Sequence, residues 1–110
     1  MITFNLKLED MPSRDKKLSN IAKVENFKSS KSGLPIANQF IITLQNGIEV
    51  FQSYNSIIAV KANNETYLDQ NRWNYSRTTS RYRNQFLNET TVETVKKIGF
   101  GNYTMVDLNK

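Results

Sequence analysis

Residues 39–52 read QFIITLQNGIEVFQ, two strand-favouring runs on either side of Asn46-Gly47. Branched and aromatic side chains are enriched in strands because they fit a pleated, half-buried surface. Asn-Gly is a strong hairpin signal, since both central residues of a type I′ turn need a positive φ angle. The stretch therefore predicts an antiparallel hairpin with strands over 39–45 and 48–52.

The hairpin begins a longer antiparallel series. Residues 53–55, Ser-Tyr-Asn, suit a bend, and the apolar run at 57–60 suits a third strand. Turn-forming residues at 62–64 then precede a short fourth strand at 65–69. We expect a small β-meander of about four strands.

A first helix is expected directly after the meander. Ser76 is a suitable N-cap, because its hydroxyl can accept from the free amides of a first helical turn. One helix face would carry Tyr75, Thr79, Tyr82 and Phe86. This spacing predicts that the helix packs against the sheet through these four side chains.

A second helix is marked by a capping box at Thr90 and Glu93. In this pattern the hydroxyl and the carboxylate each accept from the backbone amide of the other residue. The apolar stripe of this helix is expected to be Val92, Val95 and Ile98. Gly99 is expected to end the helix.

The two ends of the chain complete the expected fold. Residues 2–8 alternate in polarity and predict a strand, and the basic segment 1–35 can serve in part as an arm. Residues 18–24 fit either a short helix or a strand, and residues 103–108 allow a closing strand. The prediction is a single α+β domain over 1–110, with a compact core at 39–108 in which two short helices follow the meander.

Composition limits the chemistry that the chain can perform. Its 110 residues and 12.8 kDa suit one domain. It has no cysteine and no histidine, which excludes disulfides, thiol nucleophiles and triads that use imidazole. The 15 Lys and Arg against 10 Asp and Glu give a net charge of +5, which favours acidic partners.

The sequence also carries expectations about location. No apolar run approaches the roughly 20 residues of a membrane span, and the N-terminal alternation differs from a signal peptide. The abundance of Asn, Lys and Ile is typical of an AT-rich genome. We expect no membrane partner and a place in the cytoplasm of a bacterial host.

A carboxylate-based enzyme is the main catalytic option that remains. Lys61, Glu65 and Asp69 lie on consecutive expected strands and can approach one another, as a magnesium-dependent nuclease would require. The alternative is that they cap a solvated hairpin edge. Since the chain also lacks glycine-rich phosphate-binding motifs, we expect no enzymatic activity, no metal and no cofactor.

The most basic stretch lies at 72–83, which holds four of the five arginines. On a helix, Arg77 and Arg81 share a face, where like charges repel unless a partner uses them. Arginine makes forked contacts to phosphate or carboxylate. The candidate partner- or nucleic-acid-binding residues are Arg72, Trp73, Arg77, Arg81, Arg83 and Asn84.

The aromatic residues of this stretch allow two interpretations. Trp73, Tyr75 and Tyr82 have π-faces on which bases can stack. In the other interpretation these side chains belong to the core with Phe86, and the arginines form a solvated face. We favour the core for the aromatics and partner binding for the arginines.

Residues 73–87, WNYSRTTSRYRNQFL, together with FQSYNSIIA at 51–59 and YLD at 67–69, carry a resemblance to a known group. They resemble small uncharacterised proteins encoded by phages and mobile elements of low-GC Gram-positive bacteria. The pattern Tyr-Ser-x-Thr-Thr-x-x-Tyr-Arg-Asn-x-Phe is its core, and the similarity spans about 39–108. The resemblance implies a phage or plasmid setting and no mechanism.

In a phage or plasmid setting, we consider three hypotheses for the function, in order of preference. The first is a counter-defence inhibitor of the anti-CRISPR type, which binds a host nucleic-acid-targeting nuclease, or its nucleic-acid complex, without turnover. The second is a phage accessory protein that binds DNA or RNA directly through the basic, aromatic-laced helix. The third is a structural or host-takeover protein with neither target.

Overall fold

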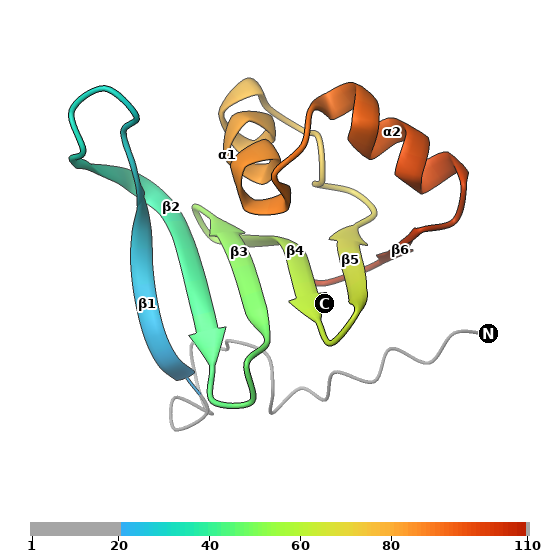
Figure 1. The fold of residues 1–110 in the computed structure, drawn as a ribbon, viewed down its shortest axis with the longest axis horizontal. Helices are drawn as coiled ribbons and strands as arrows, with labels where there is room; N and C mark the ends of the chain where they lie inside the picture. Colours follow the sequence, from blue (N-terminus) through green and yellow to red (C-terminus); the bar gives the residue numbers. More distant parts are fainter. Residues whose placement is uncertain (1–20, 110) are drawn as a thin grey trace.

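The structure is a computed structural model in which residues 21–109 are described (Figure 1). The strand expected at 2–8 and the first twenty residues of the basic segment lie outside this range. The elements in chain order are β1 (Ile21–Lys28), β2 (Pro35–Leu44), β3 (Glu49–Ser53), β4 (Ser56–Ala62), β5 (Glu65–Asp69), α1 (Arg77–Leu87), α2 (Thr91–Gly99) and β6 (Tyr103–Val106).

The strands form one sheet whose spatial order is the sequence order, β1-β2-β3-β4-β5-β6. Neighbours pair antiparallel from β1 to β5, whereas β6 pairs parallel to β5. The α+β class is confirmed, with strands first, two helices next and a closing strand. The sheet is larger than the expected meander because β1 and β6 extend it at its two edges.

Strand β1 resolves the ambiguity of the segment 18–24 for residues 21–24, because residues 18–20 lie outside the described residues. From Ile21 onward the chain is extended, and Val24 pairs with Ile42 of β2. A short amphipathic run does not distinguish helix from strand, and here the hydrogen-bonding edge of β2 selects the strand. The sheet therefore begins before residue 39, where the compact core was expected to start.

The β2–β3 hairpin is confirmed, but its turn is not the expected type I′. The Gly47 amide donates to the Leu44 carbonyl at 2.9 Å, which places Gln45 and Asn46 at the centre of the turn. Of the turn residues only Gly47 has a positive φ, +88°. This is a three-residue loop closed by a left-handed glycine, the next most common way to join two antiparallel strands.

The two faces of the sheet belong to two separate apolar clusters. Phe51 and Leu68 point toward the helices and pack with Tyr82 and Phe86 of α1. Val50, the neighbour of Phe51 along β3, points to the opposite face with the residues Ile42, Val60, Tyr67 and Leu108. Successive strand residues alternate between faces, so one sheet builds both clusters. Figure 1 shows both helices on the same side of the sheet.

Helix α1 packs largely as expected. Its N-cap is Ser76, whose hydroxyl accepts from the Thr79 amide at 3.0 Å. Thr79, Tyr82 and Phe86 are buried, whereas Tyr75, which precedes the helix, is 46% exposed. The predicted stripe is therefore correct within the helix and wrong at Tyr75.

Helix α2 has the predicted capping box but not the predicted orientation. Both reciprocal bonds between Thr90 and Glu93 are present. Val92 and Val95 are nevertheless 63% and 52% exposed, and Thr94 is the buried residue. Val92 and Val95 of the expected stripe thus face outward, whereas Ile98 is half-buried and packs on the apolar cluster beneath the helices. Thr94 makes polar contacts that are described below.

Candidate functional site

The loop at 70–76 and helix α1 carry the six candidate binding residues, and the structure separates them into two groups. Arg72, Arg77 and Arg81 are exposed. The others are the half-buried Trp73 and Asn84 and the fully buried Arg83. The basic face therefore has fewer exposed arginines than the sequence predicted, because Arg83 lies inside the domain.

Arg83 is held by neutral oxygens from three segments. One terminal nitrogen, Nη1, donates to the Trp73 carbonyl at 2.7 Å and to Asn74 Oδ1 at 2.9 Å. The other, Nη2, donates to Asn84 Oδ1 at 2.8 Å and Thr91 Oγ1 at 2.9 Å. Burial lowers the pKa of Arg83, although the Glu89 charge acts in the opposite direction. Arg83 thus joins the loop to both helices, which corrects its prediction as a partner-binding residue.

Trp73 completes this internal contact. The Arg83 guanidinium carbon lies 5.1 Å from the centre of the Trp73 ring. The ring packs on the apolar cluster beneath the helices, so Trp73 favours the core interpretation. Asn74, the next residue, also accepts from the Ser80 hydroxyl, so the loop is fixed along one side of α1.

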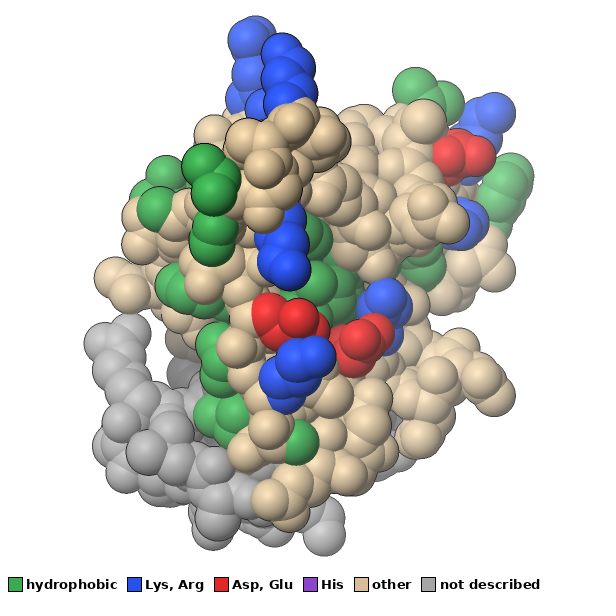
Figure 2. Space-filling view, turned by 60° about the vertical axis from the view of Figure 1, so that its left-hand side comes forward, with side chains coloured by type: hydrophobic (Ala, Val, Ile, Leu, Met, Phe, Trp, Pro, Cys, Tyr) green, Lys and Arg blue, Asp and Glu red, His purple; other side chains and the backbone are tan. Residues whose placement is uncertain are grey.

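The exposed arginines have no carboxylate partner within residues 21–109. The ion pairs there are Lys23–Glu25, Lys61–Glu49 and Lys97–Glu89, and all of them use lysine. Arg77 and Arg81 lie one turn apart on the side of α1 opposite its buried stripe. Figure 2 shows basic side chains standing out at the top of the molecule and others lying beside the acidic side chains near its centre.

An exposed tyrosine adjoins one of these cations. The Arg72 guanidinium lies 5.9 Å from the centre of the Tyr75 ring. We call Arg72, Tyr75, Arg77 and Arg81 the arginine surface. Tyr54 is a further exposed aromatic residue, 50% exposed, at the bend between β3 and β4. The residue before it, Ser53, is buried, and its hydroxyl lies 3.0 Å from that of Thr79 on the buried side of α1.

The potential nuclease residues Lys61, Glu65 and Asp69 each form hydrogen bonds with different partners. Lys61 donates to the Phe86 carbonyl at 2.9 Å and pairs with Glu49. Glu65 accepts from the Tyr67 hydroxyl. Asp69 accepts backbone amides from residues 71 and 108 at 3.1 and 2.7 Å. Each side chain therefore stabilises a different part of the fold.

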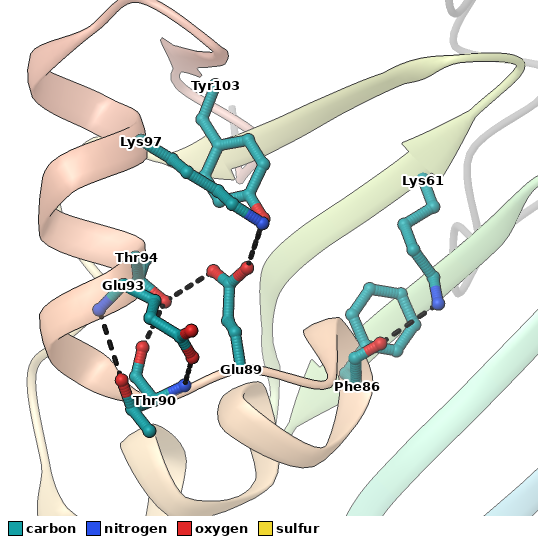
Figure 3. A network of polar contacts seen from close by, with 8 residues as sticks. All are labelled: Lys61, Phe86, Glu89, Thr90, Glu93, Thr94, Lys97 and Tyr103. Atoms are coloured by element: carbon teal, nitrogen blue, oxygen red, sulfur yellow. Dashed lines mark hydrogen bonds and ion pairs between the residues drawn. The ribbon is translucent and has the colours of Figure 1, made fainter.

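A polar network that the sequence did not reveal is centred on Glu89, in the loop between the helices (Figure 3). Its carboxylate accepts from the Lys97 ammonium and the Tyr103 hydroxyl, both at 2.7 Å, and from the Thr94 hydroxyl at 2.6 Å. Its side chain is only 3% exposed. We call Glu89 and its three donors the Glu89 network.

Ionisation reflects this arrangement. Burial alone would raise the pKa of Glu89, but the hydrogen bonds from Lys97, Thr94 and Tyr103 outweigh it, and the pKa lies below its ordinary value. Burial and the bond to Glu89 raise the pKa of Tyr103 to about 12. The hydrogen bond to Glu89 also raises the pKa of Lys97. At neutral pH, Glu89 is therefore a carboxylate, Lys97 is a charged ammonium and Tyr103 is a neutral phenol.

Residues 21–109 contain no group of three or more acidic, histidine or cysteine side chains that could hold a metal ion. Neither of the two helices in this range is long and apolar enough to cross a membrane.

Comparison with known proteins identifies a family. Residues 22–102 match DUF8033, a family of unknown function, so the chain belongs to this family. The match begins in β1 and runs through both helices into the turn before β6. No curated protein and no solved structure matches the chain.

Proposed function

We propose that the protein acts by stoichiometric binding without catalysis, and that its arginine surface contacts the phosphate backbone of DNA or RNA. One observation carries the proposal: Arg72, Arg77 and Arg81 are exposed and have no carboxylate in ion-pair distance among the described residues. Arginines without an acidic partner on one helix face repel each other, and phosphates relieve that repulsion.

The surroundings of the arginines favour an anion. The first turn of α1 contains no acidic residue, so the positive end of the helix dipole is not neutralised there. Tyr75 offers an exposed ring beside Arg72, and such a ring can stack on an unpaired base. Binding without turnover is supported by the separate structural roles of Lys61, Glu65 and Asp69.

A counter-defence inhibitor of the anti-CRISPR type is the second candidate. In this proposal the protein blocks a nucleic-acid-targeting nuclease in the cytoplasm of a bacterial host, and the arginine surface contacts the guide or target strand. The exposed apolar residues of α2 favour it, because they are suited to a protein rather than to a phosphate backbone. Inhibition that is complete at an equimolar ratio, measured in a cleavage assay with an RNA-guided nuclease, is the expected result.

Direct binding is tested by fluorescence anisotropy with labelled duplex DNA, single-stranded DNA and RNA at about 50 and about 200 mM salt. We expect binding that weakens steeply as salt increases. Arg77→Ala and Arg81→Ala should each weaken it and lower the slope of log K against log salt by about one.

Lys23→Ala is the matched control, because it removes one exposed positive charge from β1, away from the arginine surface. It should leave the salt slope unchanged. A thermal unfolding curve for each variant confirms that the fold is intact. Binding that does not depend on salt, or equal binding by the Arg77→Ala/Arg81→Ala double variant, would refute phosphate contact.

A further inference from the structure

Helix α2 presents an apolar surface to solvent. Val92, Val95 and Phe100 are 63%, 52% and 79% exposed. Together with Lys96 and Gly99 they occupy positions i, i+3, i+4, i+7 and i+8, which lie along one helix face. We call these five residues the α2 surface. Single exposed apolar residues are ordinary, but three on one face of a short helix form a patch.

The outward orientation of this patch is fixed by polar contacts. Thr94, on the opposite side of α2, donates to Glu89, and Lys97 and Tyr103 donate to the same carboxylate. Turning α2 so that its valines faced the sheet would break the bonds from Thr94 and Lys97, leave the buried carboxylate with Tyr103 as its donor, and remove Ile98 from the apolar cluster beneath the helix. The fold therefore stabilises the exposed state of Val92 and Val95.

The charge of the α2 surface comes from one residue. Glu93 is used in the capping box, and Lys97 is paired with Glu89. Lys96 is exposed and forms none of the ion pairs found within residues 21–109. It lies one turn from Val92 and one turn from Phe100. The α2 surface is thus apolar with one positive charge in its middle, which forms no ion pair among the described residues, and the exposed Glu93 carboxylate lies three residues before it.

Gly99 leaves a position without a side chain on this surface. A Cβ built on Gly99 would meet nothing within 4 Å, and its φ is not positive. Neither packing nor backbone conformation within the domain requires a glycine here, and glycine in a helix is unfavourable relative to alanine. A bare backbone position between Lys96 and Phe100 allows the side chain of another molecule to approach closely.

We propose that the α2 surface docks a protein partner that presents an apolar surface with a carboxylate opposite Lys96. A second copy of this chain is a poor occupant, since two molecules of net charge +5 repel. Nucleic acid is a poor occupant too, because three of the five residues are apolar and offer phosphate no hydrogen bond. The proposal does not depend on what the arginine surface binds.

The test uses a photoreactive side chain. Benzoylphenylalanine replaces Val95 in the full chain, and in a control protein it replaces Lys31 in the β1–β2 loop, at the far edge of the sheet. Both proteins are irradiated in cells of the organism that encodes the chain, and the products are identified by mass spectrometry. The captured protein is then purified and titrated calorimetrically with the wild type, Val95→Ser, Lys96→Glu and Lys31→Glu.

One protein should be captured at position 95 and not at position 31. Val95→Ser and Lys96→Glu should each weaken its binding by about tenfold, whereas Lys31→Glu should not change it. Replacing an acidic residue of the partner by lysine should restore binding to Lys96→Glu. The proposal is overturned if position 95 captures nothing beyond the control, captures only a second copy or nucleic acid, or if the variants bind like the wild type. Circular dichroism of each variant excludes misfolding as the cause.

Discussion

The Tyr103 hydroxyl donates a 2.7 Å hydrogen bond to the Glu89 carboxylate, which joins the edge strand β6 to the loop between the two helices. The same carboxylate accepts from Lys97 and Thr94 of α2. One buried acid therefore fixes the position of α2 relative to the sheet. This makes Glu89 the residue whose replacement should have the widest structural effect.

Glu89→Gln should lower the free energy of unfolding by about 2 kcal/mol, because it removes the buried charge that three donors share. Urea denaturation measures this change. Glu93→Gln is the control, since its side chain is exposed and an amide oxygen can still accept the Thr90 amide bond. Equal stability of Glu89→Gln and the wild type would show that the network contributes little.

The Glu89 network also predicts the response to acid. Because the pKa of Glu89 is lower in the folded state, its carboxylate stabilises the fold above the ordinary value near 4.3. That contribution should disappear as the pH falls through the lowered pKa. The wild type should therefore lose more stability than Glu89→Gln on going from about pH 6 to about pH 3. Parallel losses in the two proteins would assign the acid sensitivity to other carboxylates.

Arg83→Lys should cost about 3 kcal/mol of stability despite keeping the positive charge. A lysine ammonium has three donors at one point and cannot reach the four oxygens that Arg83 binds on the loop and both helices. Thermal unfolding measures the loss. Arg81→Lys, on the exposed side of the same helix, should change stability by less than about 0.5 kcal/mol. A small loss of stability in Arg83→Lys would mean that the hydrogen bonds of the buried guanidinium contribute little to the fold.

Two glycines should respond in opposite directions. Gly47→Val should destabilise the protein by about 1–3 kcal/mol, because φ is +88° at this position and a β-branched side chain strongly disfavours that conformation. Gly99→Ala should raise stability by up to about 1 kcal/mol, since the added methyl meets nothing and alanine favours the helix. Denaturant midpoints report both changes. A harmless valine at position 47 would contradict the turn geometry of the β2–β3 hairpin.

Gln39→Met should stabilise the protein by about 1 kcal/mol. Gln39 is fully buried, and neither its amide nitrogen nor its amide oxygen has a hydrogen-bond partner among the described residues. Methionine has a similar shape and removes the cost of burying two unsatisfied polar atoms. Differential scanning calorimetry should show a higher melting temperature. A lower one would reveal that the amide contributes a contact that methionine cannot make.

Local features of this fold were predictable from sequence because their causes are local. Asn46-Gly47 marks the hairpin, although the turn type was wrong, and Thr90 and Glu93 cap a helix through a spacing of three residues. Strand β1 was ambiguous, since only the partner edge of β2 distinguishes strand from helix there.

The candidate site was less predictable because burial depends on distant contacts. Arg77 and Arg83 have the same side chain, yet one is exposed and the other is enclosed by oxygens from the loop and both helices. Likewise, the orientation of α2 follows from Glu89, a residue outside the helix. An apolar stripe identifies a helix face, but it does not determine whether that face meets the core or another molecule.

The parallel pairing of β5 with β6 joins segments that are far apart in the sequence. Strands β1 to β5 are linked by short turns, whereas the connection from β5 to β6 spans residues 70–102 and contains both helices. Strand β6 carries Tyr103, which completes the contacts of Glu89. The orientation of the α2 surface therefore depends in part on a strand outside the helix, so a partner that binds there would favour the state of the chain in which β6 is paired with β5.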